Sequence, residues 1–226
     1  MSIELLQLPL VWARLGTAMN ADDAVARAFI ERLFAEHHGE IYGYLARLTR
    51  DDELAADLAQ ETFVKAYRAV DSLVDPARAR SWLFAIANRT ALDELRRRQL
   101  IRFVPWTGES RGVAASAEEM ALRGTLSGEL ERALGRIPAR QRSALILAEI
   151  HELNGIELAA TLGVSHDAAR ALLTRARESL REALAAERAA SRERREAERA
   201  RTGRGPAGSQ QPAPDPSPTR RTGEGD

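Results

Sequence analysis

The sequence contains no cysteine, a single lysine, few aromatic residues and no long apolar run. Without cysteine the chain has no disulfides, thiolate metal ligands or thiol nucleophiles. No segment approaches the ~20 apolar residues of a membrane span. The most apolar run, residues 3–15, is interrupted by Glu4, Gln7, Pro9 and Arg14 and lacks the features of a signal peptide. We therefore expect a cytoplasmic protein that has no membrane partner.

The charge of the chain is balanced overall but unevenly distributed. The 226 residues have a formal net charge of zero, so composition alone does not predict a nucleic-acid-binding protein. Between residues 78 and 102, however, seven arginines face only Asp93 and Glu94. This segment indicates an anionic partner. The length allows one large domain or two small ones.

Two amphipathic helices are predicted at residues 53–68 and 80–98. In the first, Leu54, Leu58, Phe63 and Tyr67 form an apolar stripe, and the polar residues between them are expected to stay exposed. In the second, the apolar and small side chains turn inward and the arginines collect at the C-terminal end. These inward positions are Leu83, Ile86, Ala87, Thr90 and Leu92.

Two further helices are predicted before this pair. The first starts at Asn20 or Asp22 as the N-cap and runs towards His38 and Gly39, and the second covers residues 40–48. A turn at residues 49–52 leads to the next helix, capped by Asp51 or Asp52. A loop at residues 71–79 precedes the last one. The inward side chains expected on the first helix are Val25, Phe29, Leu33 and Phe34.

The chain is thus predicted to be all-α, with two small helical domains at residues 22–99 and 129–186. Residues 100–128 are rich in glycine and small residues and read as a linker, with one helical turn near residues 117–122. Residues 1–21 form an N-terminal extension. Residues 187–226 start as a charged helical extension and end as a disordered tail.

The second domain has the order of a helix-turn-helix. Pro138 precedes a helix whose apolar face holds Leu145, Ile146, Leu147 and Ile150. Asn154 can cap a short helix at residues 156–162. Gly163 can supply the turn, and Ser165 can cap a longer helix through Arg181.

Both domains also resemble a known family. Asp57-Leu58-x-Gln60-Glu61-Thr62-Phe63, Trp82-Leu83-x-x-Ile86-Ala87 and Asp93-x-x-Arg96-Arg97 resemble region 2 of the extracytoplasmic-function (ECF) sigma factors of bacterial RNA polymerase. Leu134-x-x-Ile137-Pro138-x-x-Gln141-Arg142, followed by the helix-turn-helix, resembles region 4 of the same family. The resemblance covers about residues 22–184. It implies a factor that directs core polymerase to promoters and helps to open them.

The resemblance also implies which residues meet each partner. Region 2 would dock on the clamp helices of core polymerase and recognise the −10 promoter element, and its loop at residues 71–79 would capture an unstacked base. Region 4 would dock near the polymerase flap and read the −35 element. The expected docking residues are Asp57, Gln60, Glu61 and Lys65. The expected −10 DNA residues are Ser72, Arg78, Arg80, Asn88, Arg89, Arg96, Arg97 and Arg98. The expected −35 DNA residues are Ser165, His166, Arg170, Thr174, Arg175 and Arg177.

The sequence departs from the family pattern at two places. The family usually has Ile-Ala-Arg-Asn where this chain has Ile86-Ala87-Asn88-Arg89, so the asparagine is displaced by one residue, about 100° around a helix. Whether Asn88 or Arg89 reaches a base therefore stays open. The second departure is Leu172, which stands where the family often has a basic residue.

Other functions find less support in the sequence. His37 and His38 are adjacent on a helix, so they diverge and make a poor metal pair. No phosphate-binding glycine loop or nucleophile motif is present, and we expect neither an enzyme nor a cofactor. The main alternative is a self-sufficient helix-turn-helix regulator that binds DNA without polymerase. A helical interaction scaffold is a third interpretation. Many ECF sigma factors are held by an anti-sigma factor, and nothing in the sequence shows whether this chain has one.

Overall fold

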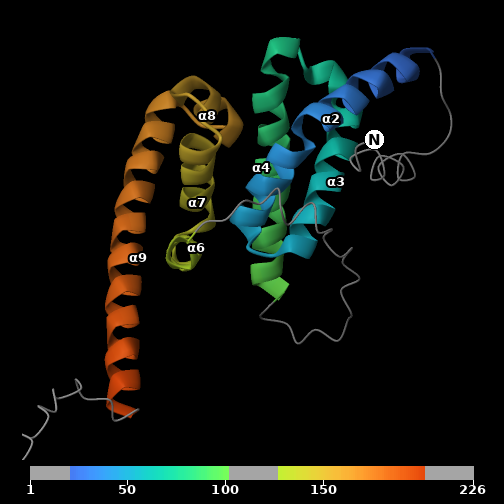
Figure 1. Cartoon of the computed structure of the whole chain (residues 1–226). Helices are drawn as coiled ribbons and strands as arrows, with labels where there is room; N and C mark the ends of the chain where they lie inside the picture. Colours follow the sequence, from blue (N-terminus) through green and yellow to red (C-terminus); the bar gives the residue numbers. More distant parts are fainter. Residues whose placement is uncertain (1–20, 102–126, 202–226) are drawn as a thin grey trace, which may run out of the picture. The chain divides into compact units, whose positions relative to one another are not determined.

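The computed structural model describes residues 21–101 and 127–201, and every regular element in these ranges is helical. The first region contains α2 (Ala21–Thr49), α3 (Asp52–Arg68), the short helical turns η2 (Val70–Ser72) and η3 (Pro76–Arg78), and α4 (Ala79–Ile101). The second contains α6 (Gly128–Arg136), α7 (Ala139–Leu145), the π-helical turn η4 (Ile146–Ile150), α8 (Gly155–Leu162) and α9 (His166–Arg201) (Figure 1). The all-α prediction is confirmed for the described residues. The N-terminal extension, the predicted linker turn and the tail lie outside them.

Helix α2 is one continuous helix, whereas the sequence predicts two helices here. Gly39 does not interrupt it, although a glycine inside a helix costs about 1 kcal/mol relative to alanine. Phe34 on one side of Gly39 and Ile41 on the other are both buried in the same core, and this packing outweighs the local preference. The helix ends at Thr49, and Arg50 follows with a φ of 62°.

The turn after α2 is fixed by a side-chain cap. The carboxylate of Asp51 accepts a hydrogen bond from the backbone N–H of Leu54 (3.0 Å), as the sequence predicts for one of the two aspartates. Ten residues of α3 are buried, including Phe63, whose ring lies 4.8 Å from that of Phe34 between centroids. The inward position predicted for Val25 is wrong, because this side chain is 73% exposed near the start of α2.

In the second region the predicted caps are confirmed. Asn154 and Glu157 form a reciprocal capping box at the start of α8. Gly163 has a φ of 66°, the left-handed conformation that glycine adopts without strain. The hydroxyl of Ser165 accepts a hydrogen bond from the N–H of Ala168 at 3.2 Å. These contacts produce the expected helix-turn-helix of α8 and α9.

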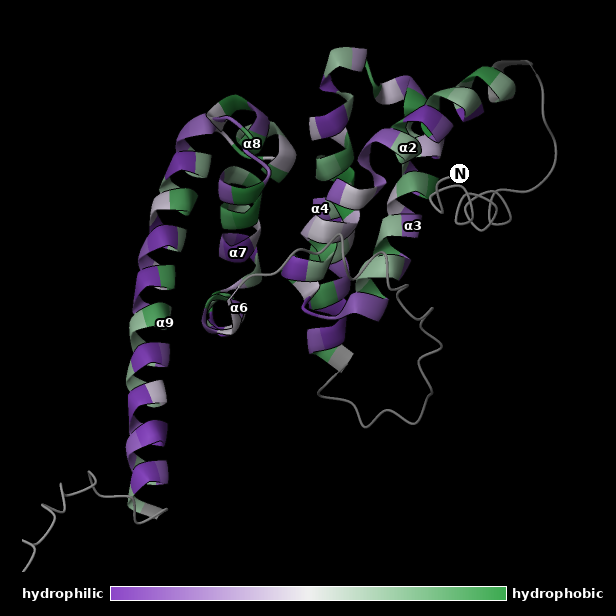
Figure 2. Cartoon of the chain, viewed as in Figure 1, coloured by the Kyte–Doolittle hydropathy of each residue, from purple (hydrophilic) through white to green (hydrophobic). Residues whose placement is uncertain are grey.

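Helix α9 is longer than predicted for the recognition helix, reaching Arg201 instead of Arg181. The helical extension expected from residue 187 is therefore part of the same helix as far as Arg201. Hydrophilic residues dominate its C-terminal part (Figure 2). The described residues up to Glu187 belong to one compact unit, and a second unit starts at Arg188.

The two regions share a hydrophobic core within the unit that ends at Glu187. Helix α4 packs against α8, and α2 packs against α7 and η4. Ile146, Leu147, Leu158 and Ala159 of the second region are buried in the same cluster as the core of the first. A separate cluster lies within the second region and contains Leu134, Ile137, Leu145 and Ala176. The sequence does not predict an interface between the regions.

Candidate nucleic-acid interface

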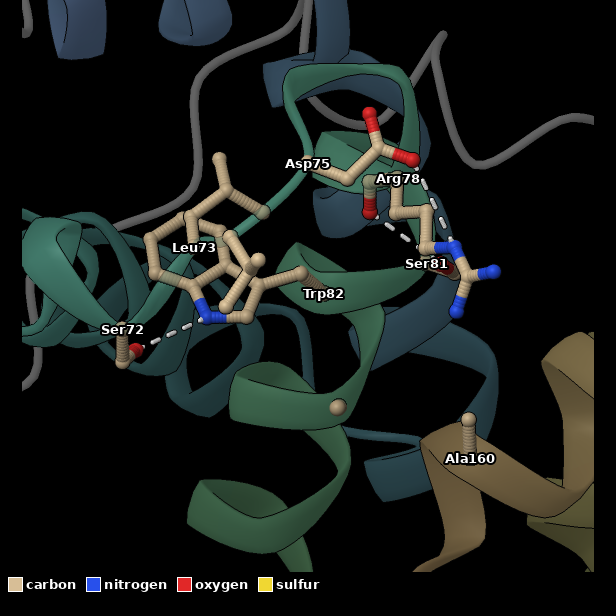
Figure 3. A pocket seen from close by; sticks show the side chains of 9 residues that line it. Ser72, Leu73, Asp75, Arg78, Ser81, Trp82 and Ala160 are labelled. Atoms are coloured by element: carbon tan, nitrogen blue, oxygen red, sulfur yellow. Dashed lines mark hydrogen bonds and ion pairs between the residues drawn. The ribbon is translucent and has the colours of Figure 1, made fainter.

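A pocket of about 530 Å³ lies where the loop at residues 71–79 meets α4. The loop is folded by local hydrogen bonds, since Asp75 caps η3 by accepting from the N–H of Ala77 at 3.0 Å. Trp82 contributes a flat aromatic surface, and its indole N–H donates to the hydroxyl of Ser72 at 3.4 Å (Figure 3). The lining residues are Ser72, Leu73, Val74, Asp75, Arg78, Ser81, Trp82, Ala85 and Ala160.

The chemistry of this pocket suits an unpaired base. An aromatic ring with aliphatic neighbours offers a stacking surface, and the surrounding polar groups can bond to base edges. Arg78 lies beside Asp75, with the guanidinium Nε 3.6 Å from the carboxylate. Both side chains are largely exposed. Trp82 is partly buried against the core, and the sequence did not identify it as a pocket residue.

The arginines at the end of α4 are all held by carboxylates. Arg96 pairs with Asp93 at 2.9 Å, and Arg97 pairs with Glu94 at 2.7 Å. Arg98 pairs with both Glu94 and Asp51. The hydrogen bond from Arg97, with help from Arg98, lowers the pKa of Glu94 although burial opposes it. Three carboxylates thus balance three guanidinium groups, and the positive field of this end is weaker than the sequence suggests.

Asn88 and Arg89 have opposite environments. Asn88 is 5% exposed, and its side-chain oxygen accepts from the hydroxyls of Tyr44 (3.0 Å) and Ser143 (2.8 Å). Arg89 is exposed, and no ion pair is formed by it within the described residues. Of the two side chains, only that of Arg89 is therefore exposed to solvent.

Arg80 is also held inside the structure. Its guanidinium forms two hydrogen bonds with Glu40 (2.9 and 3.2 Å) and a third with the carbonyl of His151 (2.9 Å). Burial tends to raise the pKa of Glu40, but the hydrogen bond and charge of Arg80, helped by His151 and His37, lower it. Arg80 therefore joins α4 to α2 and to the second region.

The four docking positions predicted on α3 differ in exposure. Lys65 is exposed, while Asp57 and Glu61 are half-buried. Lys65 pairs with Glu61 at 2.8 Å and also donates to the hydroxyl of Thr90 at 3.1 Å. The expectation that Gln60 stays exposed is wrong, because it is 2% exposed and belongs to the packed face of α3.

The recognition helix presents its predicted residues to solvent. All six positions expected to meet the −35 element are exposed. The ring of His166 covers Gly155 so closely that a β-carbon there would lie 2.7 Å from the ring Nε2, which fixes how α8 meets α9. Arg177 pairs with Glu149 at 2.7 Å. Arg170 and Arg175 form no ion pair with any residue that the structure describes, so their charge is available to an anion.

No group of three or more histidine, aspartate or glutamate residues lies close enough to hold a metal ion in the described ranges. Within these ranges no helix is long and apolar enough to span a membrane.

Comparison with known proteins shows the family. Residues 33–101 match Sigma-70 region 2, and residues 127–180 match Sigma-70 region 4. The RNA polymerase sigma factor YlaC of Bacillus subtilis is 34% identical over 159 residues, which cover 69% of this chain and 92% of YlaC. The ECF RNA polymerase sigma factor SigE of Mycolicibacterium smegmatis is 32% identical over 175 residues, 75% of this chain and 68% of SigE.

A solved structure shows the same fold. The sigma factor RpoE of Bartonella quintana, in complex with the anti-sigma factor NepR, superposes with a TM-score of 0.54 at 24% identity. The match covers 68% of this chain and 95% of RpoE. The fold and the exposed helix-turn-helix are those of a sigma factor. The chain belongs to the ECF family of RNA polymerase sigma factors, which are transcription initiation factors and not catalysts.

Proposed function

We propose that this chain brings core RNA polymerase to promoters through two DNA-binding surfaces, without catalysing a reaction itself, and that it does so in the cytoplasm. The observation that carries the proposal is the exposed face of α9, where Arg170 and Arg175 are unpaired among the described residues. Arginine on a recognition helix forms bidentate hydrogen bonds with guanine in the major groove. Thr174 lies between them on the chain, and its hydroxyl already donates to the carbonyl of Arg170 at 3.1 Å. This face would read the −35 element, with Ser165, His166 and Arg177 at its edges.

The pocket beside Trp82 would hold an unpaired base of the −10 element. Stacking of a base on an aromatic side chain contributes about 1–3 kcal/mol, which offsets part of the energy of strand separation. Ser72 and Arg78 line the pocket, and Arg89 lies further along α4. Arg96, Arg97 and Arg98 would follow the phosphates after exchanging their internal carboxylate partners. The exposed side of α3, with Asp57, Glu61 and Lys65, would dock on the clamp helices, and Gln60 would support this surface from beneath. By the same family resemblance an anti-sigma factor is a further candidate partner.

Run-off transcription tests the proposal. Purified protein and bacterial core polymerase are incubated with a genomic promoter library, and a mobility-shift assay is run without polymerase. We expect transcripts that depend on the protein and no sequence-specific shift by the protein alone. Arg170→Ala is expected to reduce the transcript yield at least tenfold. Arg192→Ala, the same change 22 residues and about 33 Å further along α9, serves as the matched control. A tight specific shift without polymerase, and no transcripts with it, would support the self-sufficient regulator instead.

A further inference from the structure

Arg142 is a buried charge that has no counter-charge among the described residues. It lies on α7 and is 9% exposed, and its Nε is buried without a hydrogen-bond partner in this part of the chain. No ion pair joins its side chain to any residue that the structure describes. Burial lowers the pKa of Arg142 to about 10, and the charge of Arg50 acts in the same direction. The guanidinium therefore stays protonated at neutral pH, although buried charges in proteins are normally paired.

Arg50 brings a second positive charge to the same place. It directly follows α2 in the left-handed conformation, with a φ of 62°, and it is exposed. A β-carbon added at Gly135 would overlap the Arg50 guanidinium, so this group lies against the backbone of α6 where a side chain is missing. The guanidinium has neither an ion pair nor a hydrogen bond with a described residue. Arg50 therefore reaches from the first region to the second and adds a like charge beside Arg142.

Groups already present in this part of the fold compensate the two charges incompletely. Gly135 lies in the last turn of α6, and the negative end of a helix dipole favours a guanidinium there. This effect accounts for the position of Arg50 but leaves Arg142 unpaired. The carboxylate that follows Arg50 in the sequence, Asp51, already pairs with Arg98 and caps α3. Two neighbouring guanidinium groups thus lack an anionic partner among the described residues, and their repulsion is unfavourable.

We propose that Arg50 and Arg142 form a binding site for a phosphate dianion, which is either inorganic phosphate or the phosphate group of a small phosphomonoester. Each guanidinium has five N–H donors in a planar fork that matches the oxygens of phosphate. A phosphomonoester carries a charge of about −1.5 to −2 at pH 7, which balances the two arginines. A phosphodiester of the DNA backbone carries one negative charge and balances only one of them.

The site is distinct from the surfaces proposed above to bind DNA, because neither arginine belongs to them. A bound phosphate would link α2 to α6 and α7 through the two guanidinium groups. It would also supply the charge that Arg142 lacks in the folded chain. Since unfolding separates the two arginines, the ligand binds the folded chain preferentially and stabilises it.

Thermal unfolding of the full chain measures this stabilisation. Inorganic phosphate is compared with sodium chloride at the same ionic strength. With a dissociation constant of about 1 mM, 10 mM phosphate favours the folded state about elevenfold and raises the Tm by ~3–6 °C. Phosphate also stabilises proteins in general because it is excluded from their surfaces. The informative quantity is therefore the difference in Tm gain between the original chain and its variants, and titration calorimetry gives the Kd of each.

Three variants change the site in different ways. Arg50→Gln removes one charge at an exposed position, and Gly135→Ala keeps both arginines but displaces the Arg50 guanidinium. Both should weaken phosphate binding at least tenfold. Arg142→Met replaces the buried charge with an apolar side chain of similar length, so it should raise the Tm in chloride and abolish the gain from phosphate. Arg68→Gln is the matched control, because Arg68 is exposed at the other end of α3, about 24 Å along that helix.

Comparison of small phosphate esters identifies the ligand class. Methyl phosphate and dimethyl phosphate differ by one methyl group and one negative charge, and methyl phosphate should bind at least tenfold more tightly. Adenosine 5′-monophosphate is then compared with methyl phosphate. Tighter binding of the nucleotide would identify a nucleotide as the ligand. Equal binding would show that the phosphate group alone is recognised, as expected for inorganic phosphate.

The outcomes decide between a specific site and a general salt effect. Equal gains in Tm for the original chain, Arg50→Gln and Gly135→Ala would show that phosphate acts by exclusion and would overturn the proposal. Equal binding of methyl and dimethyl phosphate would refute the assignment to a dianion. A lower Tm of Arg142→Met in both salts would show that the buried charge is already compensated within the chain, which would also overturn the site.

Discussion

Lowering the pH from 8 to 5 is predicted to weaken the contact between the two regions through His151. Burial lowers the pKa of this imidazole to about 4, and the charges of Arg47 and Arg80 act in the same direction. Glu40 opposes them without cancelling the shift. Because the ring packs on Phe84 and Tyr44 across the interface, separation exposes it and returns its pKa towards about 6.5. The open form, in which the two regions are separated, then binds the proton more tightly than the closed form, in which they are in contact.

The sign and magnitude follow from proton linkage. The neutral imidazole of His151 stabilises the closed form fully above pH 6.5. This stabilisation is lost as the pH falls from 6.5 towards 4. The difference between a pKa of about 4 in the closed form and about 6.5 in the open form corresponds to ~3 kcal/mol in the free energy of opening. About 2 kcal/mol of this stabilisation of the closed form is lost by pH 5. The opening equilibrium should therefore shift about thirtyfold towards the open form between pH 8 and pH 5. The charged groups that act on His151 are Glu40, Arg47 and Arg80. Burial tends to raise the pKa of Glu40, but the hydrogen bond and charge of Arg80 lower it.

Thiol protection can measure this shift even when the open form is rare. Ser143→Cys puts the only thiol of the chain at a fully buried position in the interface. Its rate of reaction with a disulfide reagent that works at acid pH is divided by the rate of an unstructured peptide thiol at each pH. This protection factor should fall about thirtyfold from pH 8 to pH 5. In Ser143→Cys/His151→Phe it should stay nearly constant, and an equal fall in both chains would refute the role of His151.

Three further predictions concern DNA contact and stability. Arg89→Ala should lower the promoter affinity of the polymerase complex more than Arg96→Ala does, because Arg96 is already paired with Asp93. The affinity of each variant complex is measured as a function of salt concentration, and equal losses would contradict the different roles of the two arginines. Gly163→Ala should destabilise the protein by about 1–2 kcal/mol because φ is 66° there, and thermal unfolding would detect it. Phe84→Ala should lower the free energy of unfolding by about 3–5 kcal/mol, since the fully buried ring of Phe84 contacts Tyr44 and His151. Chemical denaturation measures this loss, and a value under 1 kcal/mol would mean that neighbouring side chains fill the cavity.

Local signals in the sequence were sufficient for most of the fold. Caps such as Asp51 and Asn154 act on backbone groups two or three residues away, so they can be recognised without knowing the tertiary structure. Gly163 is similar, because the conformation it permits is a property of one residue. The predicted break at Gly39 is wrong because the burial of residues on either side of Gly39 stabilises the helix, and local helix propensity does not include this burial.

The candidate site was less predictable, because charge and polarity do not reveal partners. Arg96, Arg97 and Arg98 form a basic run in the sequence, but the folded chain pairs each with a carboxylate, and one of these is Asp51, the N-cap of α3. Gln60 looked like an exposed docking residue, yet the packing of α3 buries it. Trp82 packs against the core and also lines the pocket, and nothing in the sequence marked it as a pocket residue. These differences arise from contacts between elements that are distant in the sequence.

The order of Asn88 and Arg89 shows how one position around a helix can decide between two roles. Adjacent residues point about 100° apart on α4. Asn88 therefore faces Tyr44 and Ser143 in the closed interface while Arg89 faces solvent. With the order more usual in the family, an arginine would occupy the buried position. The hydroxyls of Tyr44 and Ser143 would then lose the amide oxygen that both donate to, and a charge would lose its hydration. The asparagine accepts from both hydroxyls, so it fits the packed interface between the two regions and leaves the neighbouring arginine exposed to solvent.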